Sequence, residues 1–218
     1  MVKQGFLNLS KEEQEIVLES ALDEFSEKDY DAASLNHIIS KAGISKGSMY
    51  HYFTNKEDLY MHMIELATEK KTLFLKSALT EIGKPIDEMD FFDNLELQLK
   101  ASIDFTRSNN RYHQIGIRLQ NMPDNDLKKK IWGRFRKAFE EYMDKMVDEA
   151  ITSGEIRSDI GKEFVMRILQ FVLMRFTEIY PDYGELMKKG DQELWKEMHH
   201  LVEFLKNGLH KPTLKEEN

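Results

Sequence analysis

Apolar residues recur every three or four positions along nearly the whole chain, and this spacing constrains the fold more than any other sequence feature. Residues at that spacing lie on one face of an α-helix, and no segment shows the alternation of a half-buried β-strand. The 218 residues include only 4 prolines and 11 glycines, few for a β-sandwich of this length. The sequence therefore predicts an all-α fold of about nine helices.

Capping residues, glycines and prolines set the expected helix boundaries. The first helix begins after Ser10, which forms a capping-box pattern with Glu13, and ends near Lys28. Two short helices follow at 34–42 and 45–53, with Gly43 between them as a left-handed C-cap. The other helices are expected at 55–82, 89–108, 111–121, 124–152, 161–179 and 191–209.

Composition excludes several kinds of protein. Without any cysteine, the chain can form no disulfide, thiolate zinc site or iron–sulfur cluster. Hydrophobic residues at 41% and charged residues at 32% are typical of a soluble globular protein, and we recognise no signal peptide or membrane span. We therefore expect a cytoplasmic protein that uses no cofactor and no metal.

Residues 34–56 contain the most informative pattern in the chain. Two short helices separated by the turn Gly43-Ile44-Ser45 form a helix-turn-helix, which places its second helix in the major groove of DNA. This segment holds three lysines and no acidic residue, whereas the rest of the chain holds 28 basic and 39 acidic residues. The acidic residues that give the chain its net charge of −8 therefore lie outside this segment, so the low pI does not exclude DNA binding.

The second helix of this motif, Ser45 to Phe53, has side chains suited to DNA. Lys46 and Ser48 are donors in its first turn, and Gly47 leaves room for a phosphate. Met49 and Phe53 are expected to seat the helix on the core. The residues expected to contact DNA are Ser34, Ser45, Lys46, Gly47, Ser48, Tyr50, His51, Tyr52 and Lys56.

A wider set of residues around the motif forms a specific signature: Ala21, Phe25, Tyr30, Ser34, Ile38, Ala42, Gly43, Ser45, Lys46, Gly47, Ser48, Tyr50, Phe53, Lys56, Glu57 and Leu59. With these residues, the run from about Leu18 to Met63 resembles the N-terminal domain of the TetR family of transcriptional regulators. The sequence departs from that pattern at Asp29, where many members have glycine. Residues 1–33 also hold nine acidic residues against three lysines, so we expect modest nonspecific affinity for DNA.

The resemblance implies a ligand-responsive repressor that binds a palindromic operator as a homodimer. Its partners would be double-stranded DNA, a second copy of the chain and a small-molecule effector whose identity the sequence does not give. The implied domains are a DNA-binding domain at 1–55, a ligand-binding and dimerisation domain at 56–210, and a tail at 211–218. An effector that tilts the long helix at 55–82 would change the distance between the two recognition helices, so that they no longer fit successive major grooves.

The C-terminal part supplies two further sets of candidates. Its aromatic residues and methionines recur at helical intervals and are mostly expected in the core, but the resemblance implies that some line an effector pocket. Our candidates for that pocket are Phe91, Phe92, Tyr112, Met122, Phe139 and Phe171. The last two helices carry more apolar residues than one buried face needs, so they are either internal to one monomer or a dimer interface. The candidates for the interface are Phe164, Ile168, Phe171, Val172, Trp195, Met198, Leu201, Val202 and Leu205.

Two other classes of function remain alternatives: a helical structural or adaptor protein that binds no DNA, and a small-molecule enzyme. Residues 43–47 match the G-x-S-x-G elbow of serine hydrolases, but that elbow follows a buried strand, and the residues before Gly43 are expected to be helical. His62 with Glu65, and His199-His200 with Glu197, have helical spacing that could suit a metal, although such histidines are more often solvated. We therefore expect no enzymatic activity.

Overall fold

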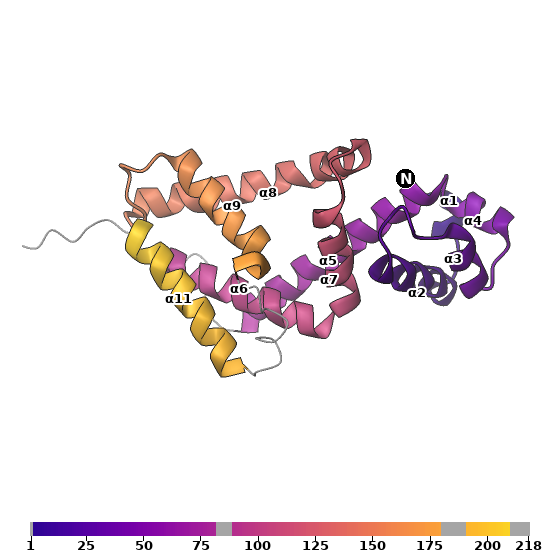
Figure 1. The fold of residues 1–218 in the computed structure, drawn as a ribbon, viewed down its shortest axis with the longest axis horizontal. Coiled ribbons are helices and arrows are strands. Elements are labelled where there is room, and N and C mark those ends of the chain that lie inside the picture. Colours follow the sequence, from indigo (N-terminus) through magenta and orange to yellow (C-terminus); the bar gives the residue numbers. More distant parts are fainter. Residues whose placement is uncertain (1, 82–88, 180–190, 210–218) are drawn as a thin grey trace, which may run out of the picture. The chain divides into compact units, whose positions relative to one another are not determined.

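A computed structural model describes residues 2–81, 89–179 and 191–209, and every regular element within these ranges is a helix (Figure 1). This confirms the all-α prediction. None of the described helices is long and apolar enough to cross a bilayer. The helices are α1 (Gln4–Leu7), α2 (Lys11–Glu27), α3 (Leu35–Lys41), α4 (Lys46–Tyr52), α5 (Lys56–Glu81), α6 (Phe91–Ser108), α7 (Asn110–Asn121), α8 (Asp126–Ser153), α9 (Lys162–Ile179) and α11 (Asp191–Leu209).

Local sequence explains where the N-terminal helices begin and end. The Ser10 hydroxyl accepts a hydrogen bond from the Glu13 amide at 3.2 Å, and the Glu13 carboxylate accepts one from the Ser10 amide at 2.9 Å, which confirms the capping box. Ser45 caps α4 by accepting from the Ser48 amide at 2.9 Å. Gly43 has a φ of +65°, the left-handed conformation that glycine adopts most easily, and it ends α3 as predicted.

Helix α1 was not predicted from the sequence. Four residues cannot show a helical period, and Phe6 is the single buried side chain among them, at 2% exposure. The Phe6 ring lies 5.0 Å from Phe53 and 5.9 Å from Tyr52, measured between ring centroids. The first residues of the chain are therefore part of the helix-turn-helix domain.

The chain forms two compact units. The first unit combines the chain up to Ser77 with the segment Ile103–Arg134, so α7 belongs to the same unit as the helix-turn-helix. The second unit combines Ala78–Ser102 with the chain after Arg134, and it holds α9 and α11. A domain boundary after residue 55 stays a prediction.

Candidate nucleic-acid interface

Helix α4 has a buried face and an exposed face. Met49 and Phe53 are 0% and 1% exposed, and they pack in a core that includes Phe25 and Ile38, as the sequence predicted. On the other side, the backbone and side chains of Ser45, Lys46, Gly47, Tyr50 and His51 are exposed, while Ser48 and Tyr52 are half-buried. Most of the residues expected to contact DNA therefore lie on the side of α4 that faces away from the core.

Gly47 is not required by the packing of the protein itself. A Cβ atom at this position would meet only the Ser45 hydroxyl, at an ordinary distance of 3.6 Å. The packing of the protein therefore does not require a glycine here. The missing side chain leaves room for a phosphate close to the start of α4. The Ser48 hydroxyl is held 2.8 Å from that of Ser45, which keeps both near the start of the helix.

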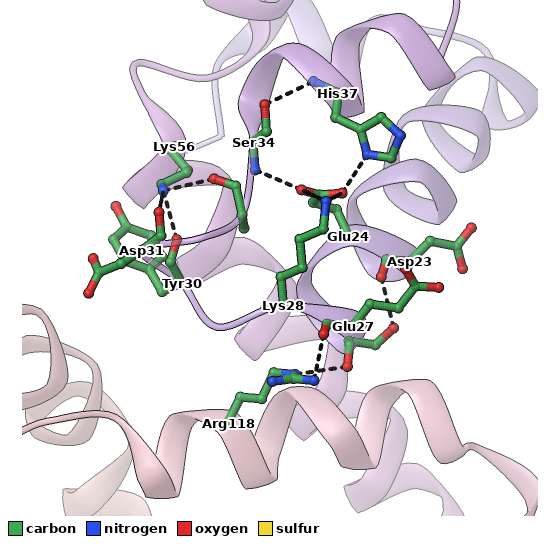
Figure 2. Close-up of polar contacts among 12 residues, drawn as sticks. Asp23, Glu24, Glu27, Lys28, Tyr30, Asp31, Ser34, His37, Lys56 and Arg118 are labelled. Carbon is green, nitrogen blue, oxygen red and sulfur yellow. Dashed lines mark hydrogen bonds and ion pairs between the residues drawn. The ribbon is translucent and has the colours of Figure 1, made fainter.

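The three lysines of the motif have different surroundings. The Lys41 ammonium lies 2.7 Å from the Asp23 carboxylate. The Lys56 ammonium donates to the carbonyls of Tyr30 at 2.7 Å and Ala33 at 2.9 Å, with the Asp31 carbonyl at 3.4 Å (Figure 2). An ammonium has three hydrogens, and these three acceptors occupy them. Lys56 therefore holds the loop between α2 and α3, a structural role that the sequence did not reveal.

A buried carboxylate joins α2 to α3. Glu24 is 2% exposed and accepts hydrogen bonds from the Lys28 ammonium at 2.8 and 3.0 Å and from the Ser34 amide at 2.7 Å. His37 Nδ1 lies 2.5 Å from the same carboxylate (Figure 2). Burial alone would raise the pKa of Glu24, but the bonds from Lys28, His37 and Ser34 outweigh it and lower the pKa to about 2. Glu24 is thus ionised and fixes the start of α3.

Ser34, one of the predicted DNA contacts, takes part in this network. Its amide donates to Glu24, and its hydroxyl accepts from the His37 amide at 3.2 Å, capping α3. Both groups are therefore used within the domain, and any contact of Ser34 with DNA would come from the remaining capacity of its hydroxyl.

Two arginines of α7 bind α2. The Arg118 guanidinium donates to the Glu27 carbonyl at 2.6 Å (Figure 2) and to the Ser26 carbonyl at 2.9 Å. It also donates to the Asp29 carboxylate at 2.8 Å. Arg111 pairs with Asp23 at 2.5 Å and with Glu19 at 2.7 Å. These pairs neutralise part of the acidic surface of α2, and nothing in the sequence indicated them.

The six predicted pocket residues are divided between the two units. Tyr112 and Met122 belong to the first unit, and the other four belong to the second. Phe91 and Phe92 are buried, with ring centroids 5.1 Å apart and planes at 88°, whereas Phe171 is 55% exposed. Met122 is buried, and Tyr112 and Phe139 are half-buried. Their role in a pocket stays a prediction.

The predicted dimer residues fall into two groups. Val172, Met198, Val202 and Leu205 are buried at 5% exposure or less within their own chain. These four side chains cannot supply much surface to a partner, because their own chain already covers them. Phe164 and Phe171 are more than half exposed, and Ile168, Trp195 and Leu201 are half-buried. Phe204, which was not predicted, is 75% exposed on α11.

The residues considered for the alternative functions have ordinary surroundings. The G-x-S-x-G match follows helix α3 rather than a strand. His62 Nδ1 lies 3.4 Å from Glu65, and His199 Nδ1 lies 3.3 Å from Glu96. Within the ranges that the structure describes, no group of three or more His, Asp or Glu side chains could hold a metal ion.

Comparison with known proteins assigns the family. Residues 17–63 match the family model for bacterial regulatory proteins of the tetR family, and residues 89–210 match that for the tetracyclin repressor-like C-terminal domain. The HTH-type transcriptional regulator YvdT of Bacillus subtilis is 24% identical over 196 residues, which cover 89% of this chain and 94% of YvdT.

Two solved structures are similar over nearly the whole chain. A TetR family transcriptional regulator from Chloroflexus aurantiacus aligns with a TM-score of 0.70 and 28% identity, covering 97% of this chain and 100% of the other. The transcriptional regulator FadR from Bacillus subtilis, in complex with stearoyl-CoA, aligns with a TM-score of 0.66 and 20% identity, covering 89% and 98%. The protein therefore belongs to the TetR family of transcriptional regulators, and its helix-turn-helix is the DNA-binding domain.

Proposed function

We propose that the protein is a ligand-responsive repressor that binds a palindromic operator as a homodimer. The observation that carries this proposal is the two-sided character of α4: Met49 and Phe53 fix it in the core, and the opposite side presents Lys46, Tyr50 and His51. Two such helices, related by a two-fold axis, would read half-sites in successive major grooves. Lys46 would bind a phosphate, and Tyr50 and His51 would meet phosphates or base edges.

The operator contact can be tested with Tyr50→Ala. The operator would first be selected from a random duplex library with the wild-type protein. Tyr50 is 43% exposed, so its removal should leave the fold intact and lower operator affinity about tenfold or more in fluorescence anisotropy. Tyr142→Ala, which removes a 48% exposed tyrosine from α8, is the matched control and should bind normally. An adaptor would select no duplex, and unchanged binding by Tyr50→Ala would show that the contact is assigned wrongly.

We further propose that the effector carries an anionic group. Lys71 of α5 keeps access to solvent, yet the protein atoms around it lower the pKa of its ammonium by desolvation. Burial, and then the positive charge of Lys71, lower the pKa of His113 on α7 to about 4, so this imidazole is neutral. Lys71 has no carboxylate partner among the described residues. A carboxylate or phosphate on the effector would pair favourably with this ammonium. FadR, which was solved with stearoyl-CoA, supports this class of ligand.

Stearoyl-CoA is the probe for this part of the proposal. It should lower the affinity of the wild-type protein for the selected operator about tenfold, because a ligand that favours a tilted α5 would change the spacing of the two α4 helices. Lys71→Met should lose most of this response. Lys137→Met is the control, since it removes the same charge from an α8 residue whose side chain is 84% exposed. An equal loss in both variants would indicate general electrostatic attraction and contradict the assignment.

A further inference from the structure

Helix α1 binds the C-terminal end of the recognition helix α4. The Lys3 amide donates to the Tyr52 carbonyl at 3.0 Å, and the Lys3 ammonium donates to the Tyr50 carbonyl at 2.8 Å. The last carbonyls of a helix have no partner inside it, and α4 has only seven residues. Lys3 therefore satisfies two carbonyls of the element that faces DNA.

Phe6 ties α1 to the core beneath α4. Besides its contacts with Tyr52 and Phe53, its ring lies 6.1 Å from His62 of α5. Because Phe6 is only 2% exposed, α1 cannot leave α4 without exposing a large aromatic side chain to water. The position of α1 relative to α4 is thus fixed by one side-chain anchor and two hydrogen bonds from Lys3.

Gly5 lies directly against His51. A Cβ atom at position 5 would overlap the His51 imidazole ring, the closest such overlap among the described glycines. The backbone of Gly5 is in an ordinary helical conformation, so its dihedral angles do not require glycine. The atoms that a Cβ would meet belong to the end of the exposed His51 side chain, so the imidazole ring would have to move aside. On its other side the imidazole lies 6.0 Å from the Tyr52 ring. The exposed His51 ring therefore lies between the backbone of α1 and Tyr52, in space that the missing side chain of Gly5 leaves open.

We propose that Gly5 is a positioning residue for DNA recognition: the bare backbone of α1 at Gly5 sets the place from which the His51 imidazole meets the operator. Lys3 and Phe6 hold α1 where it can do this. The inference rests on the proposed function, because it needs His51 to face DNA. It adds a specificity determinant that lies outside the helix-turn-helix and does not itself touch DNA.

A merely structural role for α1 makes a different prediction. If α1 only covered the core, a small change at Gly5 would alter stability and leave base preference unchanged. Alanine is also the better helix former, so Gly5→Ala should not weaken α1 through its propensity. Any loss of operator binding in this variant would then come from displacement of the His51 ring.

A double-mutant cycle on the full chain tests the proposal. Gly5→Ala, His51→Ala and the double variant would be compared with wild type by anisotropy on the selected operator and on random duplex. We expect each single variant to bind the operator about tenfold more weakly, with little change on random duplex. The double variant should bind no more weakly than His51→Ala alone, since Gly5 acts through His51. Gln4→Ala, an exposed neighbour on α1, is the control and should match wild type.

Base preference gives a second measurement. Repeating the operator selection with Gly5→Ala and with His51→Ala should relax the same base-pair position in each half-site, and Gln4→Ala should relax none. The inference would be overturned by any of three outcomes: losses of operator affinity that add in the double variant, normal operator binding by Gly5→Ala, or normal operator binding by His51→Ala. Failure of the proposed function is recognised separately, because the wild-type protein would then select no duplex from the random library.

Discussion

Single lysines show how much of a residue's chemistry depends on its partners. Counting charges gives residues 34–56 three lysines and no acidic residue, but Lys41 pairs with Asp23, and Lys56 is bound to carbonyls of residues 30, 31 and 33. Among the described residues, Lys46 alone of the three has no hydrogen-bond or ion-pair partner. The partners of Lys56 lie 23 to 26 residues away in sequence, so no local pattern could have revealed them.

Lys46 should therefore account for most of the motif's contribution to the salt dependence of operator binding. Releasing counterions from one phosphate contact contributes a slope of about 0.9 to a plot of log affinity against log salt concentration. Lys46→Gln should reduce the magnitude of the slope by about one for each subunit, measured by anisotropy between about 50 and 200 mM salt, the range in which such contacts weaken. Lys137→Gln on α8, 84% exposed, is the control. An unchanged slope would show that Lys46 binds no phosphate.

Glu24 should make the stability of the DNA-binding domain depend on pH. Its pKa is about 2 in the folded protein against an ordinary value of 4.5, so its contribution is present above pH 4.5 and is lost as the pH falls towards 2. At pH 7, Glu24→Gln should lower the free energy of unfolding by roughly 2 to 3 kcal/mol, because its partners Lys28 and His37 are partly solvated and screen the full effect.

Urea unfolding between pH 2 and pH 7 (about the span of the titration) would measure this difference. The wild-type and Glu24→Gln curves should converge as the pH falls below 4.5. Glu15→Gln, an exposed carboxylate on the same helix, should differ from wild type by less than about 0.5 kcal/mol throughout. A constant gap at every pH would mean that the variant acts through packing and not through charge.

At the level of helices, the boundaries set by caps could be predicted, and the contacts between helices could not. Ser10, Gly43 and Ser45 act on neighbours three or four residues away, so their sequence context was sufficient. Helix α1 was too short to show a period. Arg118 binds carbonyls of α2 91 and 92 residues away, a distance over which a single sequence carries no pairing information. The exposed side of α4 could be predicted from its own residues. The Lys3 contacts that hold α1 against it span almost fifty residues of sequence, so they could not.

The link between α7 and α2 should depend on the shape of Arg118 as well as its charge. The guanidinium fork reaches two carbonyls and one carboxylate, and it is 27% exposed. A lysine has the same charge but a single donor nitrogen, which cannot reach these three separated acceptors together. Arg118→Lys should therefore lower the free energy of unfolding by about 1 to 2 kcal/mol. Hydrogen exchange should accelerate at the C-terminal end of α2. Arg136→Lys, on the exposed surface of α8, should change neither measurement.

For the whole molecule, the sequence showed an excess of apolar residues on the last two helices but not which of them are covered. Val172 and Val202 are buried in their own chain, whereas Phe164, Phe171 and Phe204 are exposed by 55% to 75%. Phe164 and Phe171 are seven residues apart on α9 and so lie on one face of it. We infer that these exposed phenylalanines, rather than the buried residues beside them, form the surface that meets a second copy.

Phe171→Glu and Phe204→Glu should each convert the proposed homodimer to a monomer of unchanged helix content, since an exposed side chain can be charged without opening a cavity. Light scattering after size exclusion would give the mass, and circular dichroism the helix content. A monomer carries one recognition helix, so operator affinity should fall about a hundredfold or more through loss of the second half-site contact. Lys137→Glu on α8 should stay dimeric and bind normally. Dimers in both phenylalanine variants would place the interface on another surface, and unfolding of either would show that its side chain supports the core.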